Sequence, residues 1–370
     1  MRIKLKNTPE QVELVKAMAS KDGVKSSQAR EAFAAFVSPV VQEVLNLLGT
    51  ARLILRDLPF GENDNPEVPL DMFYSTSVDQ VTVWSQSMAG GLPSSLVTGL
   101  QTLKLHTYRL DSAVSLLERN VAKGRLPIVS LALNRLTQEL LLKQERNRWA
   151  VILKALGEAQ SGSNKHVITA NTANVVQVDD FNKWQTRAKI INTAFDGVGT
   201  PDQMFTKGAT DAFLSPEGME QIRTWAYQPM NTRAVPNTDE STAVPLPDSI
   251  REQIYNAAGI PEIFGITLHE MMEFGISRVY NTLFAKFITG TINGPAGSAF
   301  STSVDEIIVG ADLTRDTAIR PVLTDGDTGS EVRVEVDDAF VKRSGKIGWF
   351  CGVEEGAAIL DGRQLTGLAW

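Results

Sequence analysis

A long apolar run with helical spacing occupies residues 126–157, which read LPIVSLALNRLTQELLLKQERNRWAVILKALG. Between Pro127 and Gly157 the run contains no glycine or proline, the two residues that most often interrupt a helix. Apolar side chains recur near helical spacing, at Leu133, Leu136, Leu140, Trp149, Leu153 and Leu156. A helix of about 29 residues is a rod of roughly 44 Å. Such a rod is long for a compact enzyme, so the run favours a mechanical role.

Composition narrows the class of protein further. The 370 residues carry a formal net charge of −7, whereas a protein that wraps DNA through phosphate contacts is expected to be basic. Cys351 is the single cysteine, so an intrachain disulfide and a cysteine-rich metal cluster are both excluded. We find no secretory signal and no apolar stretch of the ~18 residues that cross a bilayer. We expect about two domains in a reducing compartment, with no membrane contact.

The first 56 residues are predicted to form an amino-terminal arm. Residues 1–30 carry seven basic side chains against three acidic ones. The helical pattern that follows has Ser27 as a candidate cap. Pro39 is expected to break or kink this helix, and Gly49 is expected to end it.

Residues 57–109 are predicted to form an extended two-stranded hairpin, which we call the ribbon. Runs rich in valine, threonine and aromatic residues, VDQVTVWSQSM and LVTGLQTLKLHTY, flank the turn sequence AGGLPSS. Residues 57–103 contain six acidic residues and no lysine or arginine. A two-stranded ribbon is marginally stable alone. We therefore expect it to rest on another surface through residues near its tip, which are Trp84, Met88, Gly90, Gly91, Leu92 and Pro93.

The rest of the chain mixes helical and strand patterns, which indicates an α+β fold. A helix is predicted over VDDFNKWQTRAKIINTAF, capped by Asp179 or Asp180, and another after Ser215 in SPEG. The first of these has one apolar face, formed by Phe181, Trp184, Ala188 and Ile191. Near the end of the chain, EVRVEV alternates valine with charged residues, which is typical of a half-exposed strand.

The fragment LHEMMEFG looks like the start of a zinc-hydrolase helix. His269 and Glu273 are four residues apart, so on a helix they would share one face, as two ligands of one metal must. The motif requires a second histidine where Glu273 stands. The other histidines, His106 and His166, are far away in the sequence. We favour a partly buried histidine in a turn, with no metal bound.

Other catalytic and cofactor motifs are missing from the sequence. It contains no P-loop, no dinucleotide-binding glycine pattern and no G-x-S-x-G nucleophile elbow. Cys351 lies in an apolar strand pattern without a histidine nearby, which favours a small buried hydrophobe over a nucleophile. We therefore predict no enzymatic activity and no cofactor.

The order of these parts resembles that of the major capsid proteins of tailed bacteriophages, whose fold is shared with encapsulins and the floor domain of herpesvirus capsids. The hairpin around SMAGGLPSS is similar to the family's extended loop, and LNRLTQELLLKQERNRWAVILKAL is similar to its spine helix. VDDFNKWQTRAKII and DQMFTKGATDAFLSPEGMEQI are similar to the opening of its axial domain. EVRVEVDDAFVKRSGKIGWFCGVEEGAAILDGRQL is similar to a long peripheral-domain strand and the return to the axial domain. The resemblance runs from about Asp57 to Leu365.

The resemblance implies six consecutive parts. They are an N-terminal arm (1–56), an extended hairpin loop (57–109), a peripheral domain with the spine helix (110–178), an axial domain (179–304), peripheral-domain strands (305–346) and a return to the axial domain (347–370).

The resemblance also implies a function, that of a coat protein which self-assembles as hexamers and pentamers into an icosahedral shell around a double-stranded DNA phage genome. The implied location is the virion capsid, assembled in the bacterial host cytoplasm. Only about 56 residues precede the ribbon, so the scaffolding protein is expected to be separate. Further implied partners are a portal protein, a decoration protein and packaged DNA in weak, non-specific contact. Two alternatives stay open: an encapsulin-type nanocompartment shell protein and, more remotely, a metal-dependent hydrolase using His269 and Glu273.

The charges predict how neighbouring subunits meet. Residues 125–154 carry six basic and two acidic residues, a balance opposite in sign to that of the ribbon. We expect each ribbon to lie across the spine helix of an adjacent subunit. The helix residues at this contact would be Arg135, Lys143, Arg146 and Arg148. Some family members cross-link a lysine of the hairpin to a neighbouring subunit, and the absence of lysine from residues 57–103 predicts no such link here.

Overall fold

The computed structural model describes residues 8–69, 102–124, 126–159, 165–196, 208–225, 262–289, 292–295, 297, 299–326, 329–336 and 345–370. The chain divides into two compact units, drawn from residues 1–148 with 319–360 and from residues 149–318 with 361–370. Both combine helices with a mainly antiparallel sheet, which confirms the predicted α+β class. No helix within these described ranges is both long enough and apolar enough to span a membrane.

Helices of the first unit come from the predicted arm, from the predicted spine helix and from a short segment after strand β4 (Tyr108–Leu117). In the described residues they are α1 (Pro9–Met18), α2 (Gly23–Leu48), the 3-10 helix η1 (Ala51–Leu53), α3 (Glu118–Ala122) and the first part of α4 (Leu126–Glu158). α4 has 33 residues, a length of about 50 Å, and this confirms the long helix expected from the sequence. Its residues up to Arg148 belong to the first unit, and those from Trp149 onward belong to the second.

Helix α2 differs from the expectation in two ways. Asp22 caps it instead of Ser27, because the Asp22 side chain accepts a hydrogen bond from the backbone N–H of Val24. The helix also continues through Pro39 without a break, one of the two outcomes that were expected there. Packing on one face offsets the hydrogen bond that proline cannot donate. The buried residues of that face are Phe33, Val37, Val41, Val44 and Leu45.

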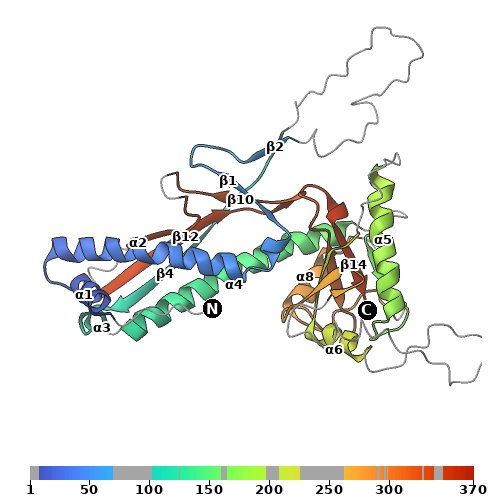
Figure 1. The fold of residues 1–370 in the computed structure, drawn as a ribbon, viewed down its shortest axis with the longest axis horizontal. Helices are drawn as coiled ribbons and strands as arrows, with labels where there is room; N and C mark the ends of the chain where they lie inside the picture. Colours follow the sequence, from blue (N-terminus) through green and yellow to red (C-terminus); the bar gives the residue numbers. More distant parts are fainter. Residues whose placement is uncertain are drawn as a thin grey trace, which may run out of the picture. The chain divides into compact units, whose positions relative to one another are not determined.

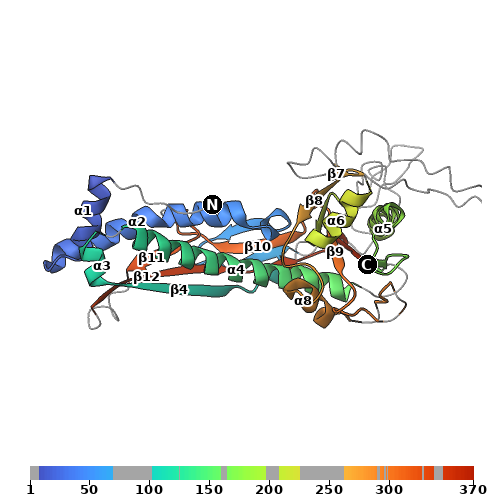
Figure 2. The ribbon, with the colours of Figure 1, turned by 90° about the horizontal axis from the view of Figure 1, so that it is seen from below.

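The first unit is built on a six-stranded sheet (Figure 1). Its strands are β1 (Arg56–Phe60), β4 (Tyr108–Leu117), β10 (Ala318–Leu323), β11 (Arg333–Val336), β12 (Lys346–Glu355) and β13 (Ala358–Ile359). β4 pairs with one side of β12 along ten consecutive residues, and β11 and β10 pair with the other side. α2 and α4 pack against the sheet (Figure 2). The core between them includes Ile347, Trp349, Cys351 and Val353 of β12.

The ribbon is described only at its base. β2 (Glu67–Pro69) and β3 (Thr102–Lys104) pair antiparallel there, and Val68 of β2 joins an apolar cluster with Leu105 and Ile319. An antiparallel pair at this point fits a segment that leaves the first unit and returns to it. The predicted tip lies outside the described residues, with all of Trp84, Met88, Gly90, Gly91, Leu92 and Pro93.

The second unit contains another six-stranded sheet, in the order β5-β14-β9-β6-β8-β7. The strands are β5 (Val167–Thr169), β14 (Leu365–Ala369), β9 (Ile307–Ala311), β6 (Asp211–Leu214), β8 (Ile266–Glu270) and β7 (Glu262–Ile263). Its other described elements are α5 (Val178–Asp196), α6 (Pro216–Thr224), α8 (Val279–Phe287), η5 (Gly362–Gln364) and the end of α4.

Local sequence patterns are confirmed in several elements. Ser215 caps α6 by accepting the backbone N–H of Gly218 at 3.0 Å. In α5 the expectation holds only in part: Asp179 and Asp180 lie inside the first turn and not at the N-cap, but Asp180 reaches back to accept the backbone N–H of Gln177 at 3.2 Å. The predicted apolar face of α5 is buried: Phe181, Trp184, Ala188 and Ile191. The strand alternation also holds, since Val332, Val334 and Val336 pack on the core while Arg333 and Glu335 are exposed or half-exposed.

Three segments fall in the other unit from the one that the resemblance implies. Residues 149–178, with the end of α4 and β5, were expected in the peripheral domain, but they belong to the second unit. β9 was expected among the peripheral-domain strands, but it pairs with β6 and β14 in the second unit. Residues from 347 onward were expected to return to the axial domain, but β12 pairs with β4 and β11 in the first unit. The chain therefore returns to the second unit at residue 361.

Acid should destabilise the second unit through His166. Its Nδ1 lies 2.9 Å from the carbonyl oxygen of Leu365, to which it donates, and burial lowers the pKa of this imidazole despite the hydrogen bond. As the pH falls below about 6.5, the unfolded chain therefore binds a proton first. Stability is lost between that pH and the lower pKa of the folded state.

We therefore expect the melting temperature of the second unit to fall as the pH is lowered from about 7 to about 5.5. The variant His166→Gln keeps a donor for Leu365 and removes the titrating group, so its melting temperature should fall less. Scanning calorimetry of both proteins measures the difference, and equal shifts would contradict the prediction.

Candidate functional site

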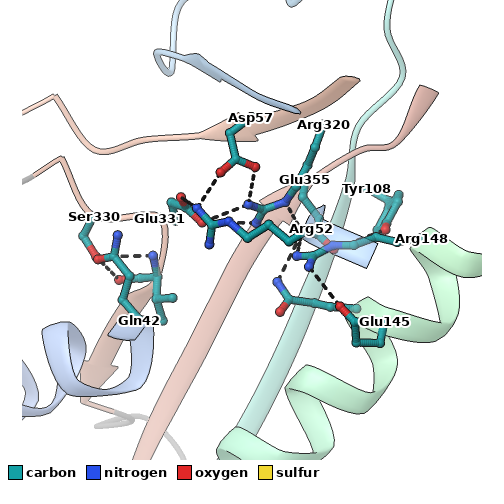
Figure 3. A network of polar contacts seen from close by, with 12 residues as sticks. Gln42, Arg52, Asp57, Tyr108, Glu145, Arg148, Arg320, Ser330, Glu331 and Glu355 are labelled. Atoms are coloured by element: carbon teal, nitrogen blue, oxygen red, sulfur yellow. Dashed lines mark hydrogen bonds and ion pairs between the residues drawn. The ribbon is translucent and has the colours of Figure 1, made fainter. Parts of the chain in front are cut away.

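Seven charged side chains form a cluster inside the first unit (Figure 3). They come from the end of the arm, strand β1 at the start of the predicted ribbon, the spine helix, strands β10 and β12, and the residues just before β11. We call this group the charge cluster; its members are Arg52, Asp57, Glu145, Arg148, Arg320, Glu331 and Glu355. It is the most extensive set of ion pairs among the described residues, and it lies where the ribbon joins the first unit.

Arg320 of β10 is the centre of the charge cluster. Its Nε is 2.9 Å from Oε2 of Glu355, its Nη1 is 2.9 Å from Oδ1 of Asp57, and its Nη2 is 3.1 Å from Oε2 of Glu331. The side chain is only 2% exposed. Burial alone would lower the pKa of the guanidinium, but the three carboxylates outweigh it and raise that pKa. Arg320 is therefore a permanently charged group held by three acids from separate segments.

Glu355, at the end of β12, joins the spine helix to the sheet. Its Oε2 accepts hydrogen bonds from Nη2 of Arg148 at 2.6 Å and from Nε2 of Gln144 at 3.2 Å. Its Oε1 accepts from the hydroxyl of Tyr108 at 3.3 Å. Burial and then the charge of Glu355 raise the pKa of Tyr108 to about 12, so the phenol stays a donor at neutral pH.

Glu145 connects the spine helix to the end of the arm. Its Oε2 accepts the backbone N–H groups of Thr50 and Ala51, at 3.1 and 3.0 Å, and the hydroxyl of Thr50 at 2.8 Å. The carboxylate thus caps the first turn of η1 from a distant helix. Gly49 leaves room for this carboxylate, because a Cβ there would lie 2.9 Å from Oε1 of Glu145 and would displace it.

The remaining contacts hold the strand that leads to the ribbon. Arg52 of η1 binds both Asp57 and Glu331 through Nη2. Asp57 of β1 is thereby shared between Arg52 and Arg320. Since β1 precedes the ribbon base, the charge cluster and the apolar cluster around Val68 both fix the root of the ribbon.

The charge cluster holds parts of the first unit together and is not arranged for catalysis. Each of its four carboxylates is paired with at least one guanidinium, so none is placed as a general base or as an open metal ligand. A buried ion pair contributes little net stability, because desolvation offsets the attraction, but breaking it leaves an uncompensated charge. The arrangement therefore fixes the geometry of the arm, ribbon root and spine helix relative to the first sheet.

The predicted spine-helix residues fall into different environments. Arg135 and Lys143 are exposed and Arg146 is half-buried. Arg148 is a correction: its side chain is 2% exposed and is bound by Glu355 and Glu145, so it is part of the interior and not of a subunit surface. Asp57, one of the six acids in residues 57–103, is likewise engaged within the same chain.

The zinc-helix interpretation of His269 and Glu273 does not hold, because His269 lies on strand β8 and Glu273 lies beyond the end of that strand. The interpretation favoured from the sequence was a partly buried histidine in a turn. His269 is partly buried, but it lies on a strand and not in a turn. The ring stacks on Phe213, with 4.9 Å between centroids, and Nε2 is 2.7 Å from Oδ1 of Asp211. Within the described ranges no three potential ligands gather into a metal site.

Cys351 is buried in the core of the first unit. Burial, and then the charge of Asp111, raise the pKa of its thiol to about 12. At neutral pH it is therefore a thiol and not the nucleophilic thiolate, in agreement with the interpretation from the sequence.

Comparisons with known proteins give only distant likenesses. No protein family matches the chain, and no curated protein matches it in sequence. Among solved structures it is similar to the capsid of an empty GTA particle, with 10% identity over 87% of this chain and 89% of that one and a TM-score of 0.48. The cyanophage Pam1 capsid has 11% identity over 86% of this chain and 88% of that one, with a TM-score of 0.46. The holo-SrpI encapsulin complex of Synechococcus elongatus has 10% identity over 87% of this chain and 88% of that one, with a TM-score of 0.43.

Proposed function

We propose that this chain is the major capsid protein of a tailed bacteriophage, which self-associates as hexamers and pentamers into an icosahedral shell around a double-stranded DNA genome. The observation that carries the proposal is the order of parts along the chain. A helical arm, a paired ribbon base, a 33-residue helix packed on a long sheet and a second sheet follow one another, and the chain ends back in the second unit. This order of elements is similar to the one that the sequence resemblance implies, although residues 149–178, 305–318 and 347–360 fall in the other unit.

The outer stripe of α4 supports association with a partner of defined chemistry. Leu131 and Leu142 are 55% and 36% exposed, and they share a helix face with Arg135, since they stand four and seven residues from it. Lys143 is exposed beside them. Two leucines and two basic side chains form a surface complementary to a segment that carries both apolar and acidic residues. The ribbon has that composition, with Trp84, Met88 and Leu92 near its tip and six acids in residues 57–103.

Within the proposal, each ribbon lies across the α4 stripe of an adjacent subunit. Arg135, Lys143 and Arg146 are its basic contacts, and Arg148 is omitted because it is buried. Burial of the ribbon tip contributes most of the contact free energy, at ~25 cal/mol per Å² of apolar surface. Each exposed ion pair contributes only ~0–1 kcal/mol, but the contact is repeated around every capsomer.

Deleting residues 88–95 should leave a folded, soluble subunit that fails to form stable shells, because the change is confined to the predicted tip of the ribbon. The double reversal Arg135→Glu with Lys143→Glu should lower the melting temperature of shells by several degrees at low salt, and less at high salt. Asp71→Lys with Asp79→Lys should partly restore it. Light scattering during thermal ramps measures both effects.

A matched control is Lys154→Glu, an exposed charge reversal about 16 Å further along the same helix than Lys143. It should leave shell assembly and melting unchanged. If the double reversal behaves like this control at low salt, the ribbon does not contact the stripe through charge.

The proposal is tested by expressing the full chain, alone and with candidate scaffolding proteins, and by imaging the particles with electron microscopy. Closed shells with five-fold and six-fold clusters are expected. A compact monomer at every protein concentration and ionic strength tested would overturn the proposal. Particles from producing cells should contain nuclease-resistant DNA, whereas shells filled with a protein cargo would assign the chain to the encapsulin class.

The expected partners follow from the same proposal. They are a separate scaffolding protein, a portal protein, a decoration protein and the packaged genome, in the virion capsid assembled in the host cytoplasm. Contact with DNA should be weak, because the net charge is −7 and the excess of basic residues is confined to residues 1–30 and to the spine helix. Binding of duplex DNA by isolated capsomers at nanomolar strength in physiological salt would contradict this part.

A further inference from the structure

Strand β4 borders the sheet of the first unit with a long open edge. All ten of its residues pair with β12 on one side, and within the described residues no strand pairs with the other side. In Figure 2, β4 lies at the margin of this sheet, outside β12. An unpaired edge of this length is a template for another strand, and monomeric proteins usually protect such edges with proline, lysine or a bulge.

β4 has no proline, lysine or bulge, and its two charged residues, Arg109 and Asp111, pair with each other; β1, at another border of the same sheet, is better protected. β1 has five residues and contains Pro59. β4 contains no proline or lysine, and its register with β12 runs from Tyr108 to Leu117 without a bulge. β1 is short and its proline cannot donate a hydrogen bond to a further strand, whereas β4 is long and has no proline. Of these two border strands, β4 is therefore the better template for a further strand.

The hydrogen-bonding direction of β4 follows from one contact at its end. The backbone N–H of Glu118 donates to the carbonyl oxygen of Gly345 at 3.0 Å, which places the even-numbered residues of the strand in hydrogen-bonded pairs with β12. The odd-numbered residues therefore direct their N–H and C=O groups toward the open edge. They are Arg109, Asp111, Ala113, Ser115 and Leu117, and all have exposed side chains.

The two faces of β4 differ in what a neighbouring strand would meet. Leu110, Val114 and Leu116 point to the core side but are only partly buried, so that core face is incomplete at its border. The opposite face carries Arg109, which bonds Asp111 at 2.7 Å. A strand that fits this edge therefore has apolar residues on one side and polar or charged residues on the other.

We propose that the open edge of β4 is completed by residues 1–7 of a second copy of this chain, added as a further strand; this inference rests on the proposed function. The segment reads MRIKLKN, in which Ile3 and Leu5 alternate with Arg2, Lys4 and Lys6. Paired with β4, the two apolar residues extend the incomplete core face, and the basic residues face solvent. The lysines then protect the new edge from further pairing.

A second copy is favoured over the same copy by where α1 begins. Ala19, just past the end of α1, borders a pocket with Leu117 at the end of β4. The start of α1 is at the opposite end of that helix, about 15 Å further along, and in Figure 2 it lies on the side away from β4. Seven extended residues span about 23 Å, so most of the segment would be used in turning back along its own α1.

Hydrogen exchange tests the proposal on the full chain. In the unassembled chain, the amides of the five odd-numbered residues of β4 should exchange rapidly. In shells the three or four of these amides that lie opposite residues 1–7 should be protected by at least about tenfold, because a strand bond must open before exchange. Deletion of residues 2–7, or Ile3→Lys with Leu5→Lys, should leave these amides unprotected. Lys4→Gln with Lys6→Gln is the matched control and should retain protection.

The source of the strand is tested by mixing two variants, one carrying Ile3→Cys and the other Val114→Cys. Oxidation of co-assembled shells should give a disulfide-linked heterodimer. A chain carrying both cysteines that links only within itself would overturn the choice of a second copy.

The outcomes for this inference and for the proposed function are distinguishable. Shells with unprotected β4 amides and no interchain disulfide would overturn the inference and leave the proposed function standing. Edge protection and the interchain disulfide in small oligomers, without any shells, would overturn the proposed function alone. Absence of shells, protection and disulfide would overturn both.

Discussion

Replacing Arg320 by methionine should lower the free energy of unfolding of the first unit by about 3–5 kcal/mol. Methionine fills much of the volume but removes the charge that Asp57, Glu331 and Glu355 share. Glu355 is fully buried, and it would keep only Arg148 as a cationic partner. Urea unfolding, followed by hydrogen exchange in peptides of each unit, measures the loss and assigns it to the first unit.

Arg333→Met is the matched control for this experiment. Arg333 lies on β11 of the same sheet, but its side chain is 66% exposed and pairs with Glu335 at the surface. Its replacement should change stability by no more than ~1 kcal/mol. If the two substitutions have equal effects, the charge cluster is not a structural centre of the first unit. A stability loss confined to Arg320→Met should be accompanied by poor shell assembly, since the cluster holds the ribbon root.

Periodic patterns in the sequence predicted the elements whose side chains face one core. The spacing of Leu133, Leu136 and Leu140 indicated α4, and all three are buried. Val334 alternates with charged neighbours and lies on β11 as expected. These predictions succeed because burial repeats with the period of the helix or strand, so that one short window contains the whole signal.

The charge cluster could not be predicted in this way because its members are distant in sequence. Arg320 pairs with Asp57 and Glu355, and neither partner lies in the same window. A partial signal existed for Arg148: it stands eight residues after Leu140 and continues the buried stripe of α4. The basic balance of the helix led to its assignment as a surface charge, whereas its position on the helix indicated burial.

Pro39 and His269 show two further ways in which local interpretation failed. Proline has a strong intrinsic preference against helix interiors, but the buried face of α2 extends on both sides of Pro39 and tertiary packing prevails. His269 was judged by its spacing to Glu273, whereas Ile266 and Leu268 alternate with Thr267 in the pattern of a strand. In both cases the longer-range packing decided the structure.

Adding a single methyl group at Gly310 should destabilise the second unit by about 3 kcal/mol, at the upper end of the cost of overpacking a core. Gly310 lies on β9 between β6 and β14, paired with Ala212 and Thr366. A Cβ there would be 2.1 Å from Cζ2 of Trp184 and 3.0 Å from Oγ1 of Thr366. Trp184 is fully buried, so its ring has no open space into which to move. Gly362→Ala is the matched control, because Gly362 also belongs to the second unit and the nearest atom to an added Cβ, Cε1 of His166, is 3.9 Å away.

The cause of that loss is tested by a second substitution, Trp184→Phe, which removes the ring carbons that a methyl group at Gly310 would overlap. Alone, this change should destabilise the second unit by leaving a cavity. In its presence Gly310→Ala should be close to neutral or stabilising, because the methyl group then occupies space that the indole has vacated. Urea unfolding of the four proteins gives the coupling between the two sites, expected at about 2–3 kcal/mol. Additive effects would show that the alanine acts through the backbone of β9, and not through contact between this strand and the apolar face of α5.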